Sequence, residues 1–241
     1  MIGIGAPAEY NSYAIKKRLG KIWRYVDFTN KRILDVGCGN GAYTMEMAKV
    51  AKFVTGIDIE PLRLTIFRKQ KEKYRIRNLV IVEMSAEELR FKDETFDIIT
   101  LIEVLEHVPN EKKCLEECKR VLKWGGQLIL FVPNKLYPFE THGAKLGKVK
   151  ISNRIPFISW LPSQIHSRIA NARVYMSWQI ERLLERAGFR IGVVDWIYPP
   201  LDKIRLPLSV KNFYRKNLAK ILELTPLRIF GVSILVIAQK R

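Results

Sequence analysis

The sequence LDVGCGNG at residues 34–41 decides the expected fold, because a short apolar run breaks there into three alternating glycines. Residues 42–50 have helical spacing, so the segment indicates a buried strand that turns tightly into a helix. Glycines let the backbone turn and let a ligand come close, and the free N–H groups at the helix start face that ligand. Asp58 ends the next apolar run and is placed to accept hydrogen bonds from ribose hydroxyls. The glycine turn and Asp58 together predict a site for a nucleoside-containing cofactor.

The spacing of the glycines separates two kinds of cofactor. Dinucleotide enzymes prefer G-x-G-x-x-G, whereas this chain has G-x-G-x-G with Asp35 just ahead of it. A carboxylate repels a phosphate but attracts a cationic amino-acid group. The pattern therefore favours S-adenosylmethionine (SAM), whose ammonium needs acceptors and which has no phosphates. A nicotinamide dehydrogenase is a distant alternative, and a glycine turn without any ligand is the alternative for the motif taken alone.

Five segments in order resemble the class I SAM-dependent methyltransferases, and the resemblance covers about residues 31–134. The segments are residues 34–41, 56–59, 84–89, 96–108 and 120–128. The most similar subgroup contains small-molecule and quinone-precursor methyltransferases. The resemblance implies an enzyme that uses SAM and releases S-adenosylhomocysteine.

Strands and helices alternate along the chain, which favours an α/β fold with a parallel sheet covered on both faces. Strands are expected at residues 32–36, 53–57, 79–84, 96–102, 127–132, 190–197 and 231–238, and helices at residues 10–25, 42–51, 62–74, 111–122, 163–173, 176–187 and 208–224. With the resemblance, this predicts a Rossmann-like, doubly wound, seven-stranded sheet that is mostly parallel with an antiparallel last strand.

The resemblance also assigns cofactor-binding residues. Asp35, Gly37, Gly39 and Gly41 would surround the methionine part, Asp58 would take both ribose hydroxyls, Ile59 would pack on the adenine, Ser85, Ala86 and Glu87 would line the adenine edge, and Glu103 would lie near the sulfonium. Ser85 departs from the family, which often has Asp at this position, so its contact would be weaker. For Glu103 the alternative is a carboxylate at a helix start that faces water.

Two histidines are candidate catalytic residues. His142 lies on a loop between Thr141 and Gly143, where no packing role is evident, and we rank it first as a general base. His107 follows the fourth strand near the expected methyl group, with a structural histidine as the alternative. His166 lies among basic residues, and this position favours a role in anion binding. Cys114 and Cys118 lie one helical turn apart, but no further ligands are suggested nearby, so no metal site is expected.

Positive charge is concentrated in the carboxyl-terminal half of the chain. Residues 134–241 hold 19 Lys and Arg against 6 Asp and Glu, a net charge of +13, whereas residues 30–133 have a net charge of +2. Such a field attracts phosphates, anionic lipid heads or nucleic acid, and a solvated surface of the kind seen in thermophiles is the alternative. No leader or long apolar span is evident, so we expect a cytoplasmic protein that can lie at a membrane surface.

One domain over residues 1–241 is expected, with three parts. Residues 30–133 would bind the cofactor, residues 134–187 would form a lid and helix around the substrate, and residues 188–241 would supply the last strands and a basic amphipathic helix. The apolar lid favours a small-molecule or lipid-like acceptor, which could be anionic. An RNA (tRNA) methyltransferase and a non-catalytic SAM-binding protein are the alternatives. Helix 208–224 would rest on an anionic membrane surface or pack on its own domain.

Overall fold

The central sheet orders its strands as β3-β2-β1-β4-β5-β9-β8 in the computed structural model, which describes residues 8–146, 149–151, 155–202 and 204–241. The strands are β1 (Arg32–Val36), β2 (Phe53–Asp58), β3 (Leu79–Glu83), β4 (Phe96–Ile102), β5 (Leu122–Pro133), β8 (Phe189–Ile197) and β9 (Ser233–Lys240). The strands from β1 to β5 pair in parallel, and β9 runs antiparallel to both β5 and β8. The predicted seven-stranded sheet with an antiparallel last strand is confirmed.

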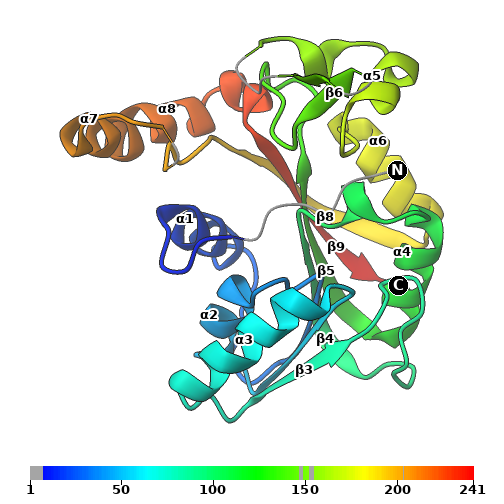
Figure 1. Cartoon of the computed structure of the whole chain (residues 1–241). Helices are drawn as coiled ribbons and strands as arrows, with labels where there is room; N and C mark the ends of the chain where they lie inside the picture. The colour runs from blue at the N-terminus through cyan, green and yellow to red at the C-terminus, as the bar shows by residue number, and fades with distance from the viewer. Residues whose placement is uncertain (1–7, 147–148, 152–154, 203) are drawn as a thin grey trace.

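Helices cover both faces of this sheet. They are α1 (Tyr13–Ile22), α2 (Ala42–Ala48), α3 (Pro61–Lys73), α4 (Glu111–Val121), α5 (Ser163–Ile169), α6 (Ser177–Arg186), α7 (Leu208–Phe213) and α8 (Ala219–Leu224), with the short turns η1 (Leu105–His107), η2 (Ile158–Trp160), η3 (Tyr214–Leu218) and η4 (Pro226–Phe230). Figure 1 shows α1, α2 and α3 on one side and α4 and α6 on the other. Within the described ranges, each helix is too short or too polar to cross a lipid bilayer.

Successive side chains of a strand point to opposite faces of the sheet, and in this sheet the side chains on both faces are apolar, so both faces are covered. In β5, Leu128 and Leu130 belong to the apolar cluster under α4 and α6, whereas Ile129 and Phe131 belong to the cluster under α1 and α2. All four side chains have no exposed surface. A strand buried on both faces reads as a continuous apolar run, which is why these strands are visible in the sequence.

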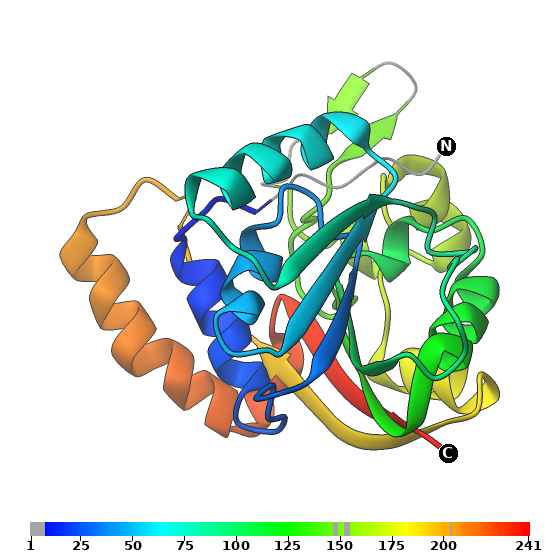
Figure 2. The same cartoon turned by 90° about the horizontal axis from the view of Figure 1, so that it is seen from below.

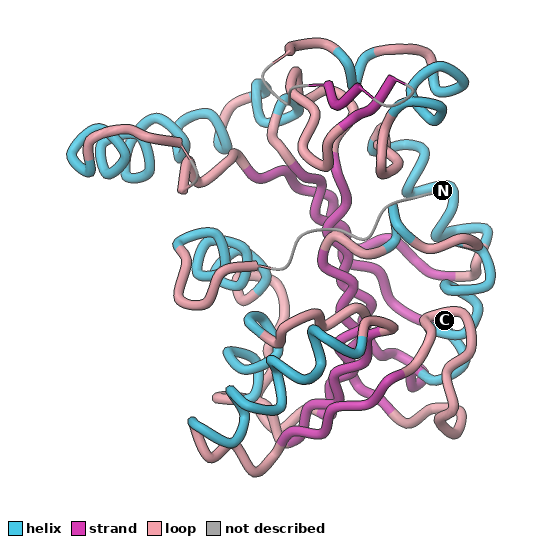
Figure 3. Tube along the Cα trace, viewed as in Figure 1, coloured by secondary structure: helices cyan, strands magenta, loops and turns pink. Residues whose placement is uncertain are grey.

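The chain between β5 and α6 differs from this regular pattern. Figure 3 shows that it consists mostly of loops, with η2, α5 and the short hairpin of β6 (Ala144–Leu146) and β7 (Val149–Ile151). The helix expected at residues 163–173 ends at Ile169, because Ala170 is extended and forms a bridge with Ala144. Residues 147–148 and 152–154 of the expected lid lie outside the described residues.

The helix expected at residues 208–224 is a continuous arm made of α7, η3 and α8, in which η3 is a single π-helical turn. Figure 2 shows the arm beside α1. Polar pairs join the two, since Glu223 of the arm contacts Lys17 and Lys21 of α1 at 2.7 and 3.3 Å. Arg215 also reaches the ring of Tyr13 at 4.4 Å. The side of the arm that faces the protein thus includes these polar contacts together with the buried Ala219.

Candidate functional site

A cavity of about 640 Å³ lies at the carboxyl ends of the parallel strands. Pockets for small ligands in proteins span about 300–1,000 Å³, and open α/β sheets place them at this edge. Eight of the expected cofactor-binding residues line it: Gly37, Gly39, Asp58, Ile59, Ser85, Ala86, Glu87 and Glu103. Among the described residues, the lining does not include Asp35 or Gly41. Segments 8–14 and 199–202, together with Tyr137 and Ile204, also contribute lining residues.

The glycine turn brings backbone to the wall of this cavity. Gly37 has φ of +69°, and a Cβ there would lie 2.4 Å from a methyl of Val104. Gly41 has φ of +85°, and its Cβ would lie 2.1 Å from the ring of Phe67. Both the left-handed backbone and the lack of space require glycine at these positions.

Asp58 holds the glycine turn in place from the next strand. One carboxylate oxygen accepts the N–H of Gly39 at 2.8 Å, and the other accepts the N–H of Glu60 at 2.9 Å. Each carboxylate oxygen can accept more than one hydrogen bond, so both retain capacity toward the cavity that Asp58 lines. The geometry thus suits a carboxylate that bonds two neighbouring hydroxyls.

Asp35 has a different environment from the one that the sequence suggests. Its two oxygens accept hydroxyl hydrogen bonds from Thr44 on α2 at 2.6 Å and from Thr100 on β4 at 2.7 Å. Burial raises the pKa of the Asp35 carboxyl to about 6, although both hydroxyls oppose the shift. The carboxylate ties α2 to the sheet behind the cavity. Its direct contact with a cofactor ammonium remains a prediction.

The wall formed after β2 and β3 is apolar with a polar edge. Ile59 is 59% exposed although it lines the cavity, so its side chain offers a free apolar surface for a flat ring. Ser85 accepts the N–H of Glu87 at 3.2 Å, and Glu87 accepts the N–H of Asn110 at 2.5 Å. These bonds fix the loop along the expected adenine edge.

Glu103 follows β4 with a left-handed backbone, φ +57°, which is strained for a residue other than glycine. Its Oε1 lies 2.8 Å from Arg18 of α1 and accepts the hydroxyl of Ser233 at 2.6 Å. Burial favours a higher pKa, but the charges of Arg18 and His142 outweigh it and hold the pKa of Glu103 below its ordinary value. The alternative of a carboxylate that faces water at a helix start is wrong.

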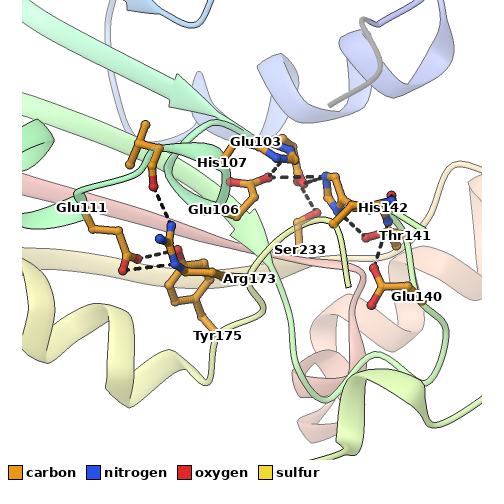
Figure 4. Close-up of polar contacts among 12 residues, drawn as sticks. Glu103, Glu106, His107, Glu111, Glu140, Thr141, His142, Arg173, Tyr175 and Ser233 are labelled. Carbon is orange, nitrogen blue, oxygen red and sulfur yellow. Dashed lines mark hydrogen bonds and ion pairs between the residues drawn. The ribbon is translucent and has the colours of Figure 1, made fainter. Parts of the chain in front are cut away.

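Glu106, His107 and His142 converge beside Glu103, as Figure 4 shows. The Nε2 atom of His142 lies 3.5 Å from Glu106 Oε1 and 3.6 Å from Glu103 Oε2. Burial, and then the charge of Glu103, raises the pKa of Glu106 well above its ordinary value. His107 lines the cavity, and the ring centre of His142 lies 5.0 Å from that of His107. The two predicted catalytic histidines are therefore brought together.

His166 is buried and not available for anion binding, so that expectation is wrong. Its Nε2 lies 2.9 Å from Glu140 Oε2, and both side chains are almost completely buried. The other oxygen of Glu140 accepts the backbone N–H of His142 at 2.9 Å. The buried pair thus supports the loop that carries His142.

Three residues of the site escape local sequence reasoning. Arg18 and Ser233 contact Glu103 across 85 and 130 positions of the chain, and no local motif indicates such contacts. Glu106 lies within the segment that resembles the family, and its spacing of three from Glu103 was the available signal. Cys114 and Cys118 of α4 are buried free thiols that pack in the apolar core.

Comparisons with known proteins identify methyltransferases as similar to this chain. Residues 34–130 match a family model described as a methyltransferase domain. A ubiquinone biosynthesis O-methyltransferase of Glaesserella parasuis is 36% identical over 110 residues, which are 44% of this chain and 46% of that protein. The enzyme of the same name from Nitrosococcus oceani is 36% identical over 132 residues, 53% of this chain and 56% of that protein. The chain thus spans about half the length of the curated relatives it matches.

Solved structures share the fold over nearly the whole chain. A SAM-dependent methyltransferase from Mesorhizobium loti superposes with a TM-score of 0.64 at 16% identity, and covers 92% of this chain and 96% of its own. One from Aquifex aeolicus has a TM-score of 0.62 at 18% identity, and covers 97% of this chain and 100% of its own. At such low identity the likeness establishes the fold alone.

Proposed function

The chain carries a methyltransferase domain with the fold of the class I SAM-dependent enzymes, and from this premise we propose that it transfers a methyl group from SAM to a small-molecule or lipid-like acceptor. The observation that carries the proposal is the cavity, which has Asp58 and Ile59 at one end and Glu103 and His107 at the other. A nucleoside with a charged sulfur fits between these ends, because one end suits hydroxyls and a flat ring and the other holds carboxylates.

The residues of the chain divide the work of such a transfer. SAM supplies an already activated methyl group, so the protein needs to align the acceptor with it and exclude water. Asp58 would hold the ribose, Ile59 the adenine face, and segment 84–87 the adenine edge. The cluster of Glu103, Glu106, His107 and His142 would orient the acceptor and take part in removing its proton.

The acceptor is proposed to be a small molecule with a hydroxyl group. The relatives that match the chain over about half of their length are named ubiquinone biosynthesis O-methyltransferases. The name describes methyl transfer to an oxygen atom, which a hydroxyl group supplies. We propose residues 134–187 as the acceptor lid, since Tyr137 and Thr141 of this part line the cavity. Aromatic pairs such as Tyr137 with Phe139 give the lid an apolar character.

A transfer screen tests the proposal. The purified chain is incubated with SAM labelled in the methyl group and with cell extract separated into lipid, RNA, protein and small-molecule fractions. Label in the small-molecule or lipid fraction is expected, and the Asp58→Ala variant should abolish it. Label in the RNA fraction alone would favour the RNA methyltransferase alternative, and binding of SAM without any labelled fraction would favour a non-catalytic role.

We also propose that the arm of residues 208–224 rests on an anionic membrane surface. Polar pairs face the protein, whereas the arm exposes the apolar side chains of Leu208, Val210, Phe213, Leu218, Ile221 and Leu224. The exposed Lys216 and Lys220 accompany them. An apolar strip with lysines beside it is the arrangement of helices that lie at lipid headgroups. A lipid-like acceptor would then be met at the membrane.

Vesicle co-sedimentation tests the arm. Binding to vesicles with phosphatidylglycerol, weakened by salt, is expected for the wild-type chain, and Phe213→Glu with Ile221→Glu should remove it. Ile66→Glu on α3 is the matched control, because it places the same charge at an exposed apolar position outside the arm. Equal sedimentation of all three proteins, or none with anionic vesicles, would overturn the proposal. Salt-sensitive retention of total tRNA instead would favour RNA as the partner of the basic half.

A further inference from the structure

Three side chains at the acceptor end of the cavity, Glu106, His107 and His142, have the spacing of ligands of a metal ion. One ligand atom from each of Glu106, His107 and His142 lies within 4.8 Å of the others. Glu106 Oε1 is 3.5 Å from His142 Nε2 and 3.9 Å from His107 Nε2. A tetrahedral ion with bonds near 2.1 Å separates its ligands by about 3.4 Å. The distances are too long for hydrogen bonds and close to those of a coordination site.

Glu106 provides a second and independent observation. Its side chain has no exposed surface, and neither carboxylate oxygen has a hydrogen-bond partner among the described residues. Burial of a carboxylate without a hydrogen bond is costly, and such groups in proteins are paired with other side chains or bind metal ions. The guanidinium of Arg18 contacts Oε1 of Glu103 at 2.8 Å and makes no ion pair with Glu106 among the described residues.

The surroundings of His142 match those of a metal-binding histidine. Its Nδ1 lies 2.9 Å from the hydroxyl of Thr141, so Nε2 is the atom that points to Glu103 and Glu106. Glu140 fixes the backbone of His142 and is itself fixed by the buried His166. Histidine ligands characteristically have their other ring nitrogen and their loop held by such outer groups.

We propose that Glu106, His107 and His142 bind a first-row divalent cation such as Zn²⁺, Mn²⁺ or Co²⁺, with Oε2 of Glu103 as a fourth ligand. Imidazole together with carboxylate suits these ions, whereas Mg²⁺ and Ca²⁺ prefer oxygen alone. Glu103 and His107 line the cavity, so an open coordination position would face the acceptor. The full set of ligands was not predicted from the sequence, because His142 is 35 residues or more from the other ligands.

The inference deepens the proposed function and rests on it for the role of the ion. An acceptor hydroxyl bound at the open position would lose its proton to solvent, since a metal ion lowers the pKa of a bound oxygen. The oxygen then forms a bond to the methyl carbon as the carbon–sulfur bond breaks. The sulfonium becomes a neutral thioether, and charge and atoms balance.

Metal binding is measured on the whole chain without any acceptor, so the result does not depend on methyl transfer. The chelator-treated protein is titrated with Co²⁺, which is followed by its visible absorption, and with Zn²⁺, Mn²⁺ and Mg²⁺ by calorimetry. One equivalent of Co²⁺ with ligand-field bands is expected, and Mg²⁺ should bind far more weakly. The isosteric Glu106→Gln and His142→Gln should each weaken binding by more than about 100-fold, and Thr141→Val by roughly 10–100-fold, as outer groups do.

Two controls make the outcome decisive. Glu116→Gln, an exposed carboxylate on α4, should leave Co²⁺ binding unchanged. Binding of S-adenosylhomocysteine by each variant shows that the fold is retained. Absence of stoichiometric binding by Zn²⁺, Mn²⁺ and Co²⁺, or equal binding by wild type, Glu106→Gln and His142→Gln, would overturn the metal site. Stoichiometric Co²⁺ binding with no labelled fraction in the transfer screen would leave the site standing and refute the proposed function.

Discussion

Asp58 has two roles at the residue scale. It accepts two backbone N–H groups that shape the glycine turn, and it lines the cavity where a ribose would lie. Hydrogen bonds to a charged group contribute about 1.5–3 kcal/mol each. We expect Asp58→Ala to weaken binding of S-adenosylhomocysteine by roughly 100-fold or more, since about 1.4 kcal/mol is a factor of ten.

Calorimetry on Asp58→Ala and on Glu83→Gln checks this expectation. Glu83 pairs with Asp58 in register on the neighbouring strand, but it is exposed and is not among the lining residues. Its variant should bind as the wild type does. Unchanged affinity in Asp58→Ala would show that this carboxylate is structural only.

The buried carboxyl of Asp35 predicts a particular pH dependence of stability. Burial raises its pKa in the folded chain to about 6 from an ordinary value of 3.8. The folded state then holds a proton that the unfolded state has already lost between these values, so stability falls as pH rises through this window. The full effect is about 3 kcal/mol, at 1.36 kcal/mol for each pKa unit, and is present above pH 6.

Urea unfolding of wild type and Asp35→Asn between pH 4 and 7 measures this effect. The wild type should lose stability over the window, and the variant should show a flatter profile because it cannot ionise there. Parallel profiles for the two proteins would mean that Asp35 has an ordinary pKa despite its burial.

Local chemistry limits what could be predicted at this scale. Asp58 and the glycines of the turn were predicted because short local motifs identify them. Asp35 was identified as buried in a strand, yet the hydroxyls that hold it come from Thr44 and Thr100 on other elements. The orientation of a side chain depends on neighbours that only the folded chain supplies.

At the scale of the element, the turn from β1 into α2 depends on two glycines with different neighbours. A methyl group at Gly37 meets Val104, and one at Gly41 meets the ring of Phe67, each with a positive φ. The left-handed backbone costs about 1–2 kcal/mol for alanine, and overpacking adds roughly 1–3 kcal/mol. We expect Gly37→Ala and Gly41→Ala each to destabilise the chain by about 2–5 kcal/mol in urea unfolding.

Gly20→Ala is the internal comparison for these variants. Gly20 lies in α1 with no atom within 4 Å of a built Cβ, so alanine should stabilise the helix by about 0.5–1 kcal/mol. A loss of stability at Gly20 similar to that at Gly37 would show that the steric argument is incorrect.

The limits of the strands were predicted best where an apolar run ends in glycine or a charge. β1 and β4 have the predicted bounds, 32–36 and 96–102. β5 begins at Leu122 and not at residue 127, because Phe96 of β4 pairs with Leu122 ahead of the glycines at 125 and 126. The early part of this strand depends on a partner strand, which the local pattern does not reveal.

The molecule as a whole assembles its cavity from parts far apart in sequence. The glycine turn, α1, residues 199–202 and the segment after β5 each contribute lining residues. The order and faces of the strands followed from alternating elements and a family pattern. The contacts that close the cavity did not, since Arg18 bonds to Glu103 and Ser233 and so joins three separate regions of the chain.

A ligand that touches all of these parts should stabilise the whole fold and not one segment. At a concentration 100 times its dissociation constant, S-adenosylhomocysteine adds about 2.7 kcal/mol to the free energy of unfolding. For a chain of this size, each kcal/mol raises the melting temperature by roughly 2–4 °C, so an increase of roughly 5–11 °C is expected. Differential scanning calorimetry with S-adenosylhomocysteine and, separately, with NADH measures it. A comparable increase with NADH and none with S-adenosylhomocysteine would contradict the assignment of the cavity, because the carboxylates at 35, 58 and 103 should repel a pyrophosphate.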